Sequence, residues 1–295
     1  MEFNGLFTKK GRCLYTHSMK RPFLAAVFLV ALVLEGFSQS TAGLSITVEE
    51  NNGRLTIVKC KGFVKEVVIP AEINGMAVTA IGDYAFAKRE LISVTIPDSI
   101  TTIGRGAFAQ NNLSELVIGD NVTSLGLGAF AYNKLSKITI GRGIAVIPRG
   151  CFQINRLRAV ELPETVTTIE DYAFFGNRLF QITIPTAVNA IGEGAFAGNR
   201  ITVLTIGGGV AKIGDGAFYN NELNRVTIPA GVEEVGQRAF NNKPKNNSFA
   251  KRVNYYDIHE QLLLSTDDSF DTYYNSQGKK SGTYIYADGT WSLSS

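Results

Sequence analysis

The chain has 295 residues, of which 45% are hydrophobic and 19% charged, and its formal net charge is +3. The first 38 residues hold five of the 29 basic and two of the 26 acidic side chains, so 24 of each sign follow them. The part of the chain after residue 38 therefore has no net charge. It lacks the basic excess that is typical of nucleic-acid binding, so we expect no nucleic-acid partner.

Residues 1–38 have the pattern of an N-terminal extension followed by a secretory signal peptide. The stretch 19–21, Met-Lys-Arg, precedes an apolar run over 22–34, and small residues follow at Gly36 and Ser38. A run of this length is too short to span a membrane comfortably. We expect cleavage near Ser38, a secreted or cell-surface protein, and no transmembrane span in the mature chain.

Residues 39–90 form an atypical first unit, which we interpret as an N-terminal cap and first coil. The segment 44–60 predicts a β-hairpin with its turn at Asn52-Gly53. "VKEVVIP" (64–70) matches the strand of the repeats that follow, and five extra residues lie around Asn74-Gly75. A distinct end unit of this kind covers a strand edge that would otherwise stay open.

Residues 91–242 repeat with a period of 22. A column of phenylalanines starts in the first unit and continues without exception: Phe86, Phe108, Phe130, Phe152, Phe174, Phe196, Phe218 and Phe240. A leucine or isoleucine column has the same spacing: Leu91, Leu113, Leu135, Leu157, Leu179, Ile201 and Leu223. An asparagine column runs beside them: Asn111, Asn133, Asn155, Asn177, Asn199 and Asn221. A strict period of this length predicts a β-rich solenoid of stacked 22-residue coils.

Within one coil, Leu116 and Ile118 alternate with Val117, which predicts a strand with one face in the core. Gly119 ends this strand, and prolines end it in other coils. Gly126 and its equivalents suit a backbone corner. A lone coil cannot bury enough apolar surface to offset the entropy of ordering its backbone, so stability belongs to the array.

The asparagine column allows two interpretations. The side chains bond backbone groups in a tight turn, which we favour, or they form a row of ligand-binding amides. We interpret the phenylalanine column as core. Cys60 and Cys151 fall in strand and core patterns about four coils apart, too far for a disulfide.

The coil "LSELVIGDNVTSLGLGAFAYNK" (113–134) closely resembles the BspA-like, treponemal-type leucine-rich repeat family, whose hallmark is I-G-x-x-A-F with a following L-x-x-V-x-I-P strand. The resemblance covers about Leu44 to Asn242. It implies a right-handed horseshoe with a parallel sheet on its concave face, and a role in surface adhesion or protein binding. The asparagine column departs from the spacing of many leucine-rich repeats. The family has no fixed functional residues to transfer.

Residues 243–295 break the period and predict a linker and a small C-terminal β-meander. Strands are expected at 270–276, 282–287 and 290–294, while 253–264 stays ambiguous. We interpret the aromatic residues of this module as a cap on the last coil, with a sugar-binding platform as the alternative: Tyr273, Tyr284, Tyr286 and Trp291.

The sequence offers little for catalysis. His259 is the one histidine after residue 38, no residues have metal-ligand spacing, and no nucleophile elbow or phosphate loop is present. A pairing of either cysteine with His259 is disfavoured, because reactive thiols need exposed, electropositive settings. We therefore expect no enzyme, no cofactor and no metal.

The outward strand positions are the candidate binding surface. Packing fixes the inward positions, whereas the outward ones vary from coil to coil. Because arginine and aromatic residues are favoured as interface anchors, we select Arg158, Phe180 and Arg225, with Glu161 and Lys137 tuning the charge. The expected partner is a protein, of the extracellular-matrix or envelope kind. A carbohydrate bound by the C-terminal aromatic residues, or a purely structural role in the envelope, is the alternative.

The signal pattern generates a prediction about processing. Because the basic and apolar stretches are followed by small residues, the mature protein should begin near Gln39 and lie outside the cytoplasm. Sequencing the N-terminus of the native protein tests this. A cytoplasmic product that still carries Met19 and the apolar run would contradict it.

Overall fold

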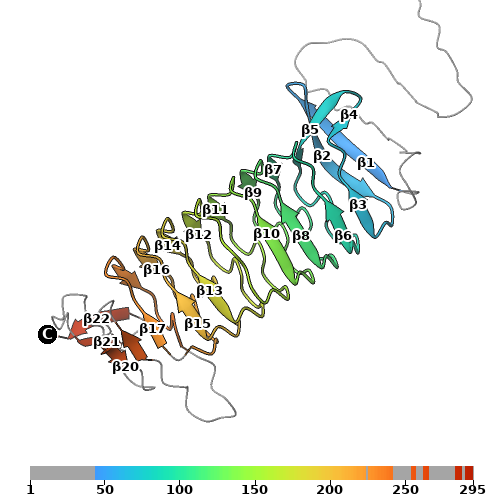
Figure 1. Ribbon diagram of the computed structural model, residues 1–295. Coiled ribbons are helices and arrows are strands. Elements are labelled where there is room, and N and C mark those ends of the chain that lie inside the picture. Colours follow the sequence, from blue (N-terminus) through green and yellow to red (C-terminus); the bar gives the residue numbers. More distant parts are fainter. Residues whose placement is uncertain are drawn as a thin grey trace, which may run out of the picture.

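The computed structural model describes residues 44–223 and 225–241 together with four later strands. These residues form a β-solenoid in which strands one coil apart lie side by side, as in the pairing of Lys137 with Glu115. The stack is elongated and its axis runs close to straight in the view of Figure 1. The signal-peptide prediction lies outside the described residues.

The long strands of the coils lie on one side of the stack, which we call the strand face. The strands are β3 (Glu66–Val68), β6 (Ser93–Thr95), β8 (Glu115–Ile118), β10 (Lys137–Ile140), β13 (Gln181–Thr183), β15 (Val203–Thr205) and β17 (Arg225–Thr227). They pair in parallel as β3–β6, β8–β10 and β13–β15. Residues 159–162 form no strand, so the sheet that the repeat predicts as continuous is interrupted there.

A second parallel sheet, of shorter strands, lies across the core. Its strands are β5 (Met76–Ile81), β7 (Thr102–Ile103), β9 (Ser124–Leu125), β11 (Val146–Ile147), β12 (Thr168–Ile169), β14 (Ala190–Ile191), β16 (Lys212–Ile213) and β18 (Glu234–Val235). The ladder runs from β5 to β9 and again from β11 to β18, but β9 and β11 do not pair.

A single proline explains the break in the second sheet. In neighbouring coils the residue after the short strand donates its N–H to the coil before, as Gly126 does to the Ile103 carbonyl at 2.7 Å and Glu170 to that of Ile147 at 2.9 Å. Pro148 occupies this position after β11 and has no N–H to donate. The bond between β9 and β11 is therefore missing.

The N-terminal unit has the hairpin that the sequence predicts at Asn52-Gly53 and a second one at Asn74-Gly75. Strands β1 (Ser45–Asn51) and β2 (Arg54–Lys61) pair antiparallel, and β2 then continues into the second sheet beside β5. The extra residues form the short strand β4 (Glu72–Ile73), which turns into β5. At both turns asparagine and glycine have positive φ, 52° and 73° at Asn52-Gly53 and 53° and 77° at Asn74-Gly75. These are the conformations that two-residue hairpin turns require.

The C-terminal segment adds β19 (Asn254–Tyr256), β20 (Leu262–Ser265), β21 (Thr283–Ala287) and β22 (Thr290–Ser294). Strand β19 pairs in parallel with β17 and antiparallel with β20, so the stretch left ambiguous by the sequence extends the strand face. Strands β21 and β22 form the predicted final hairpin. The strand expected at 270–276 lies outside the described residues.

The phenylalanine column is the centre of the core. All eight rings are at most 1% exposed, and consecutive rings stack with centroids 5.2 to 5.7 Å apart and planes within 16° of parallel. The interpretation of the phenylalanine column as core is confirmed. Each ring thus completes the apolar environment of its two neighbours.

The asparagine column joins the coils through buried hydrogen bonds. Asn155 donates through Nδ2 to the carbonyls of Phe152, in its own coil, and Phe130, one coil earlier, at 3.1 and 3.0 Å. Its Oδ1 accepts the N–H of Leu135 at 3.0 Å. The interpretation as backbone-bonding residues is confirmed, but the partners span two coils rather than one turn.

Glycine is needed at the Gly126 corner because there is no room for a Cβ, and not because the backbone has an unusual dihedral angle. A Cβ on Gly126 would lie 2.2 Å from the backbone nitrogen of Arg105 and 2.3 Å from the carbonyl carbon of Gly104, in the coil before. At Gly126 the backbone of one coil thus approaches that of the coil before so closely that no side chain fits between them, whereas the equivalent positions 148 and 170 hold Pro148 and Glu170.

The phenylalanine stack generates a prediction about stability. Replacing Phe174 by alanine should lower the free energy of unfolding by about 3–5 kcal/mol, the cost of emptying a large buried aromatic site. Thr183→Ala, at an exposed outward position, should change it by no more than about 0.5 kcal/mol. Denaturant melts compare the two variants, and equal stabilities would show that the coil register is wrong.

A second prediction concerns the asparagine ladder. The change Asn155→Ala leaves the N–H of Leu135 without a partner in a buried site, at about 1–3 kcal/mol for the unsatisfied group. The carbonyls of Phe130 and Phe152 each lose one of two bonds and keep those from Asn133 and Asn177. We expect a loss of about 1–3 kcal/mol. Asn121→Ala is the matched control, because Asn121 is exposed and donates to the Asp98 carbonyl. A loss at Asn155 no larger than at Asn121 would refute the structural role.

Candidate binding face

The strand face carries two columns of outward side chains. Alternation along each strand buries Leu116 and Ile118 of β8 and exposes Glu115 and Val117 between them. The first column is Glu66, Ser93, Glu115, Lys137, Ala159, Gln181, Val203 and Arg225, and the second is Val68, Thr95, Val117, Thr139, Glu161, Thr183, Thr205 and Thr227. The inward positions of the same strands are almost uniformly apolar. The outward columns are therefore the part of the coil that packing leaves variable.

The structure brings Arg158 and Phe180 together. They occupy equivalent positions in consecutive coils, and the N–H of Phe180 donates to the carbonyl of Arg158 at 3.3 Å. The Phe180 side chain is 48% exposed, which is high for so large an apolar group. An exposed aromatic beside an exposed arginine has the composition of an interface anchor.

The other predicted residues are spread along the face. Lys137 begins β10, directly beside Glu115 of β8, and Glu161 lies in the coil that forms no strand. Arg225 begins β17, two coils beyond Gln181, which corresponds to about 10 Å at the usual strand spacing. Lys137, Arg158, Glu161 and Phe180 thus belong to three consecutive coils, and Arg225 lies apart from them.

The residue selection missed several exposed aliphatic side chains on the same face. Val68 and Val117 are each 64% exposed, Val203 is 58% exposed and Ile92 is 40% exposed. The outward register predicted the exposure of Val117 and Val203, but the preference for arginine and aromatic anchors passed over them. Val68 precedes the regular repeats, where the five extra residues obscure the columns. Ile92 shares the 22-residue column of Arg158 and Phe180, and the same preference passed over it. The strand face is therefore more apolar than the five selected residues suggest.

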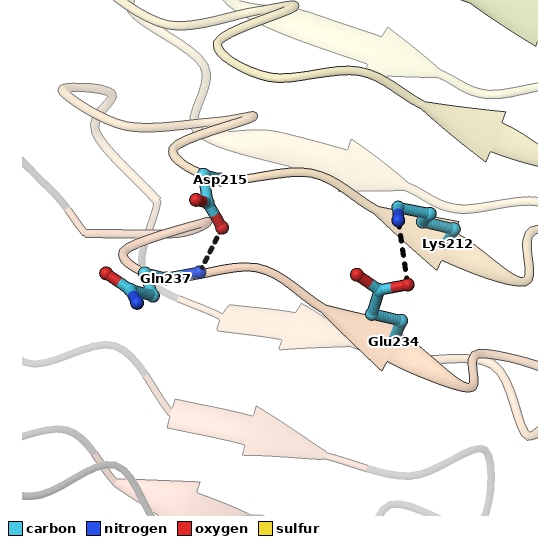
Figure 2. A network of polar contacts seen from close by, with 4 residues as sticks. All are labelled: Lys212, Asp215, Glu234 and Gln237. Atoms are coloured by element: carbon cyan, nitrogen blue, oxygen red, sulfur yellow. Dashed lines mark hydrogen bonds and ion pairs between the residues drawn. The ribbon is translucent and has the colours of Figure 1, made fainter. Parts of the chain in front are cut away.

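The opposite side of the stack has a different character. Over β12 to β18 the second sheet has an open depression of about 470 Å³ lined mainly by charged and small residues. Lys212 and Glu234, in consecutive coils, form an ion pair at 2.9 Å, and Asp215 accepts the N–H of Gln237 at 2.8 Å (Figure 2). These polar groups bond the next coil, so this side is occupied by contacts that hold the stack together.

The described part of the chain shows no reactive thiol. Burial raises the pKa of the Cys60 thiol to about 11, with Arg89 acting in the opposite direction, and burial raises that of Cys151 further still. Both cysteines are buried and unpaired with each other, so they behave as small apolar core residues. His259, the hypothetical partner of a thiol, lies outside the described residues.

The described residues contain neither a cluster of metal ligands nor a membrane-spanning helix. Among them no three His, Cys, Asp or Glu side chains gather in a way that could hold a metal ion. The described segments also contain no helix long and apolar enough to cross a membrane.

The stacked coils, parallel sheets and exposed strand face define a leucine-rich-repeat solenoid. The model of the BspA type leucine rich repeat region matches residues 79–202 and 189–288, in six copies. The chain belongs to this family, as its sequence suggested. Proteins of this family are typically found at the cell surface, and membership indicates a role in protein interaction or adhesion.

Several solved structures are similar to the chain over part of its length. A leucine rich cell surface protein from Faecalibacterium prausnitzii is 26% identical, with 70% of this chain and 74% of that one covered and a TM-score of 0.44. A leucine-rich repeat protein from Eubacterium ventriosum is 20% identical, with coverages of 74% and 72% and a TM-score of 0.36. The leucine-rich repeat protein of T. pallidum is 19% identical, with coverages of 66% and 63% and a TM-score of 0.23. None of the curated protein sequences compared with the chain matches it.

Proposed function

We propose that the chain is an exported cell-surface protein that binds a protein partner through the strand face. The observation that carries this proposal is the contrast within each strand. Inward positions repeat almost unchanged, while outward positions combine exposed apolar side chains such as Val117 and Val203 with charges such as Lys137 and Glu161. A mixed apolar and charged surface on a rigid stack suits recognition of a protein.

The pair formed by Arg158 and Phe180 is the proposed anchor. Interfaces usually depend on a few central residues, with aromatic residues and arginine favoured. The two side chains lie on adjacent coils, and Lys137 and Glu161 belong to the same three consecutive coils, so charges of both signs occur in this part of the stack. The backbone beneath them is held by the inter-coil hydrogen bonds, so little conformational freedom would be lost on binding.

The proposal assigns the chain no catalytic step, cofactor or metal. Two observations support this. The thiols of Cys60 and Cys151 are buried and neutral at physiological pH, and the acidic side chains Asp171 and Asp215 accept backbone N–H groups of the next coil. A nucleophilic thiol acts from an accessible position, which neither cysteine has, and both carboxylates are engaged in hydrogen bonds between coils.

A test of this function starts from the mature chain. Extracellular-matrix and envelope proteins recovered with it are the candidate partners, and binding of each is then measured with purified variants. The double change Arg158→Ala and Phe180→Ala should weaken binding at least about tenfold, which corresponds to about 1.4 kcal/mol. Thermal melts should match the wild type, because both side chains are exposed.

The control is a double change on the opposite side of the stack, Lys212→Ala with Glu234→Ala, which removes an exposed ion pair and should leave binding unchanged. A chain ending at residue 245 tests the carbohydrate alternative. Unchanged affinity in the Arg158 and Phe180 variant, together with loss of binding in the shortened chain, would transfer the site to the C-terminal segment and refute the strand-face proposal.

A further inference from the structure

The loop between β2 and β3 carries the most exposed large apolar side chain found among the described residues. Phe63 is 92% exposed, whereas its neighbours in sequence, Cys60 and Val64, are buried. Gly62 precedes it with φ of 109°, a backbone conformation that L-residues rarely adopt. The loop therefore turns the phenyl ring outward while the residues on both sides stay in the core.

Three lysines lie close to this ring in the sequence, on both sides of it. Lys59, Lys61 and Lys65 are all exposed, and the segment 59–65 contains no acidic residue. We call this segment the Phe63 tip. The next charges along the chain and in the adjacent coil are of both signs: Glu66, Lys88, Arg89 and Glu90. Ile92, itself 40% exposed, lies beside Lys65, whose carbonyl accepts the N–H of Ile92 at 2.7 Å.

We infer that the Phe63 tip is a peripheral membrane-contact site that binds anionic phospholipid surfaces. The exposed phenyl ring enters the boundary between headgroups and acyl chains, where aromatic side chains are favoured. The three ammonium groups lie around it on flexible stems and reach the negatively charged headgroups. No segment crosses the bilayer in this arrangement.

The position of the tip in the chain supports a membrane partner. Strand β1 begins at Ser45, which pairs with Lys61, so the polypeptide enters the solenoid beside the tip. Figure 1 shows β1 and β2 at the N-terminal end of the stack. The apolar run of the predicted signal peptide ends at Leu34, ten residues before Leu44, and ten extended residues span at most about 35 Å. During export, a chain still joined to its signal peptide would hold the tip close to the membrane.

The chemistry of the tip favours a bilayer over a second protein site. A protein partner would have to offer a pocket for one protruding ring, and energetically important interface residues are normally surrounded by a wide rim of contacts. A lipid surface accepts a single aromatic wedge with a basic surround, and each lysine near an anionic surface strengthens binding by about fivefold.

The test uses the mature chain from Gln39 and flotation with lipid vesicles. Vesicles that contain about one-third phosphatidylglycerol in phosphatidylcholine should bind the protein, and pure phosphatidylcholine vesicles should bind it at least about tenfold more weakly. Phe63→Ala should weaken binding to the anionic vesicles about tenfold, and Lys61→Gln with Lys65→Gln about twentyfold or more. Added salt should weaken the wild type toward the lysine variant, because surface charges are screened.

The matched controls are Phe180→Ala and Lys137→Gln, which remove an exposed phenylalanine and an exposed lysine from the strand face. Both should bind vesicles like the wild type, and all variants should melt alike. The inference is overturned if the wild type does not bind anionic vesicles, if Phe63→Ala binds as the wild type does, or if the strand-face controls lose as much binding as the tip variants. Loss in the lysine variant alone would likewise reject it, because the attraction would then be electrostatic and independent of the ring.

Discussion

The structure depends on one constraint, which is the close stacking of the backbone of each coil on that of the next. A Cβ at Gly126 would lie 2.2 Å from the nitrogen of Arg105, so even the smallest chiral side chain is excluded at that corner. At this separation the rings of the phenylalanine column stack at 5.2 to 5.7 Å. The same separation lets one asparagine amide bond the carbonyls of two coils. The ring stack, the asparagine hydrogen bonds and the close backbone contact therefore all require the same separation between coils. Insertion of residues into a coil would disturb all three.

The coil register could be predicted from the sequence because identical residues at identical spacing can become neighbours only by stacking. The strand of β8, the burial of Phe174 and the turn at Asn52-Gly53 follow from alternation, period and turn chemistry. Such patterns do not predict the hydrogen bonds between coils. The gap between β9 and β11 depends on one absent N–H at Pro148, and the second carbonyl partner of Asn155 belongs to the coil before it. Local propensity carries no information about either contact.

The candidate site was predictable to a smaller extent. Arg158 and Phe180 share a column, so their adjacency follows from the period alone. The apolar contribution of Val68 did not follow, because the register there is displaced, and Glu66 pairs with Ser93 rather than with a residue 22 positions away. Residues at outward positions do not affect packing, so their sequence variety alone cannot distinguish a selected surface from an unconstrained one. Exposure of large apolar side chains adds an independent physical criterion, since each one leaves apolar area in water.

The strand face and the Phe63 tip differ in how a repeat can produce them. Every added coil extends the strand face by two outward positions, so a repeat builds a surface whose length and composition can vary while the core stays the same. The tip requires a glycine at φ 109° between a strand and the first coil, which occurs where the chain enters the stack. It also requires lysines on β2. One edge of β2 pairs with β5, and the other edge is covered by β1 rather than by another coil. An end unit can therefore carry a contact that the regular coils do not. A solenoid held at a membrane by its first unit would keep its coils accessible to a partner along their whole length.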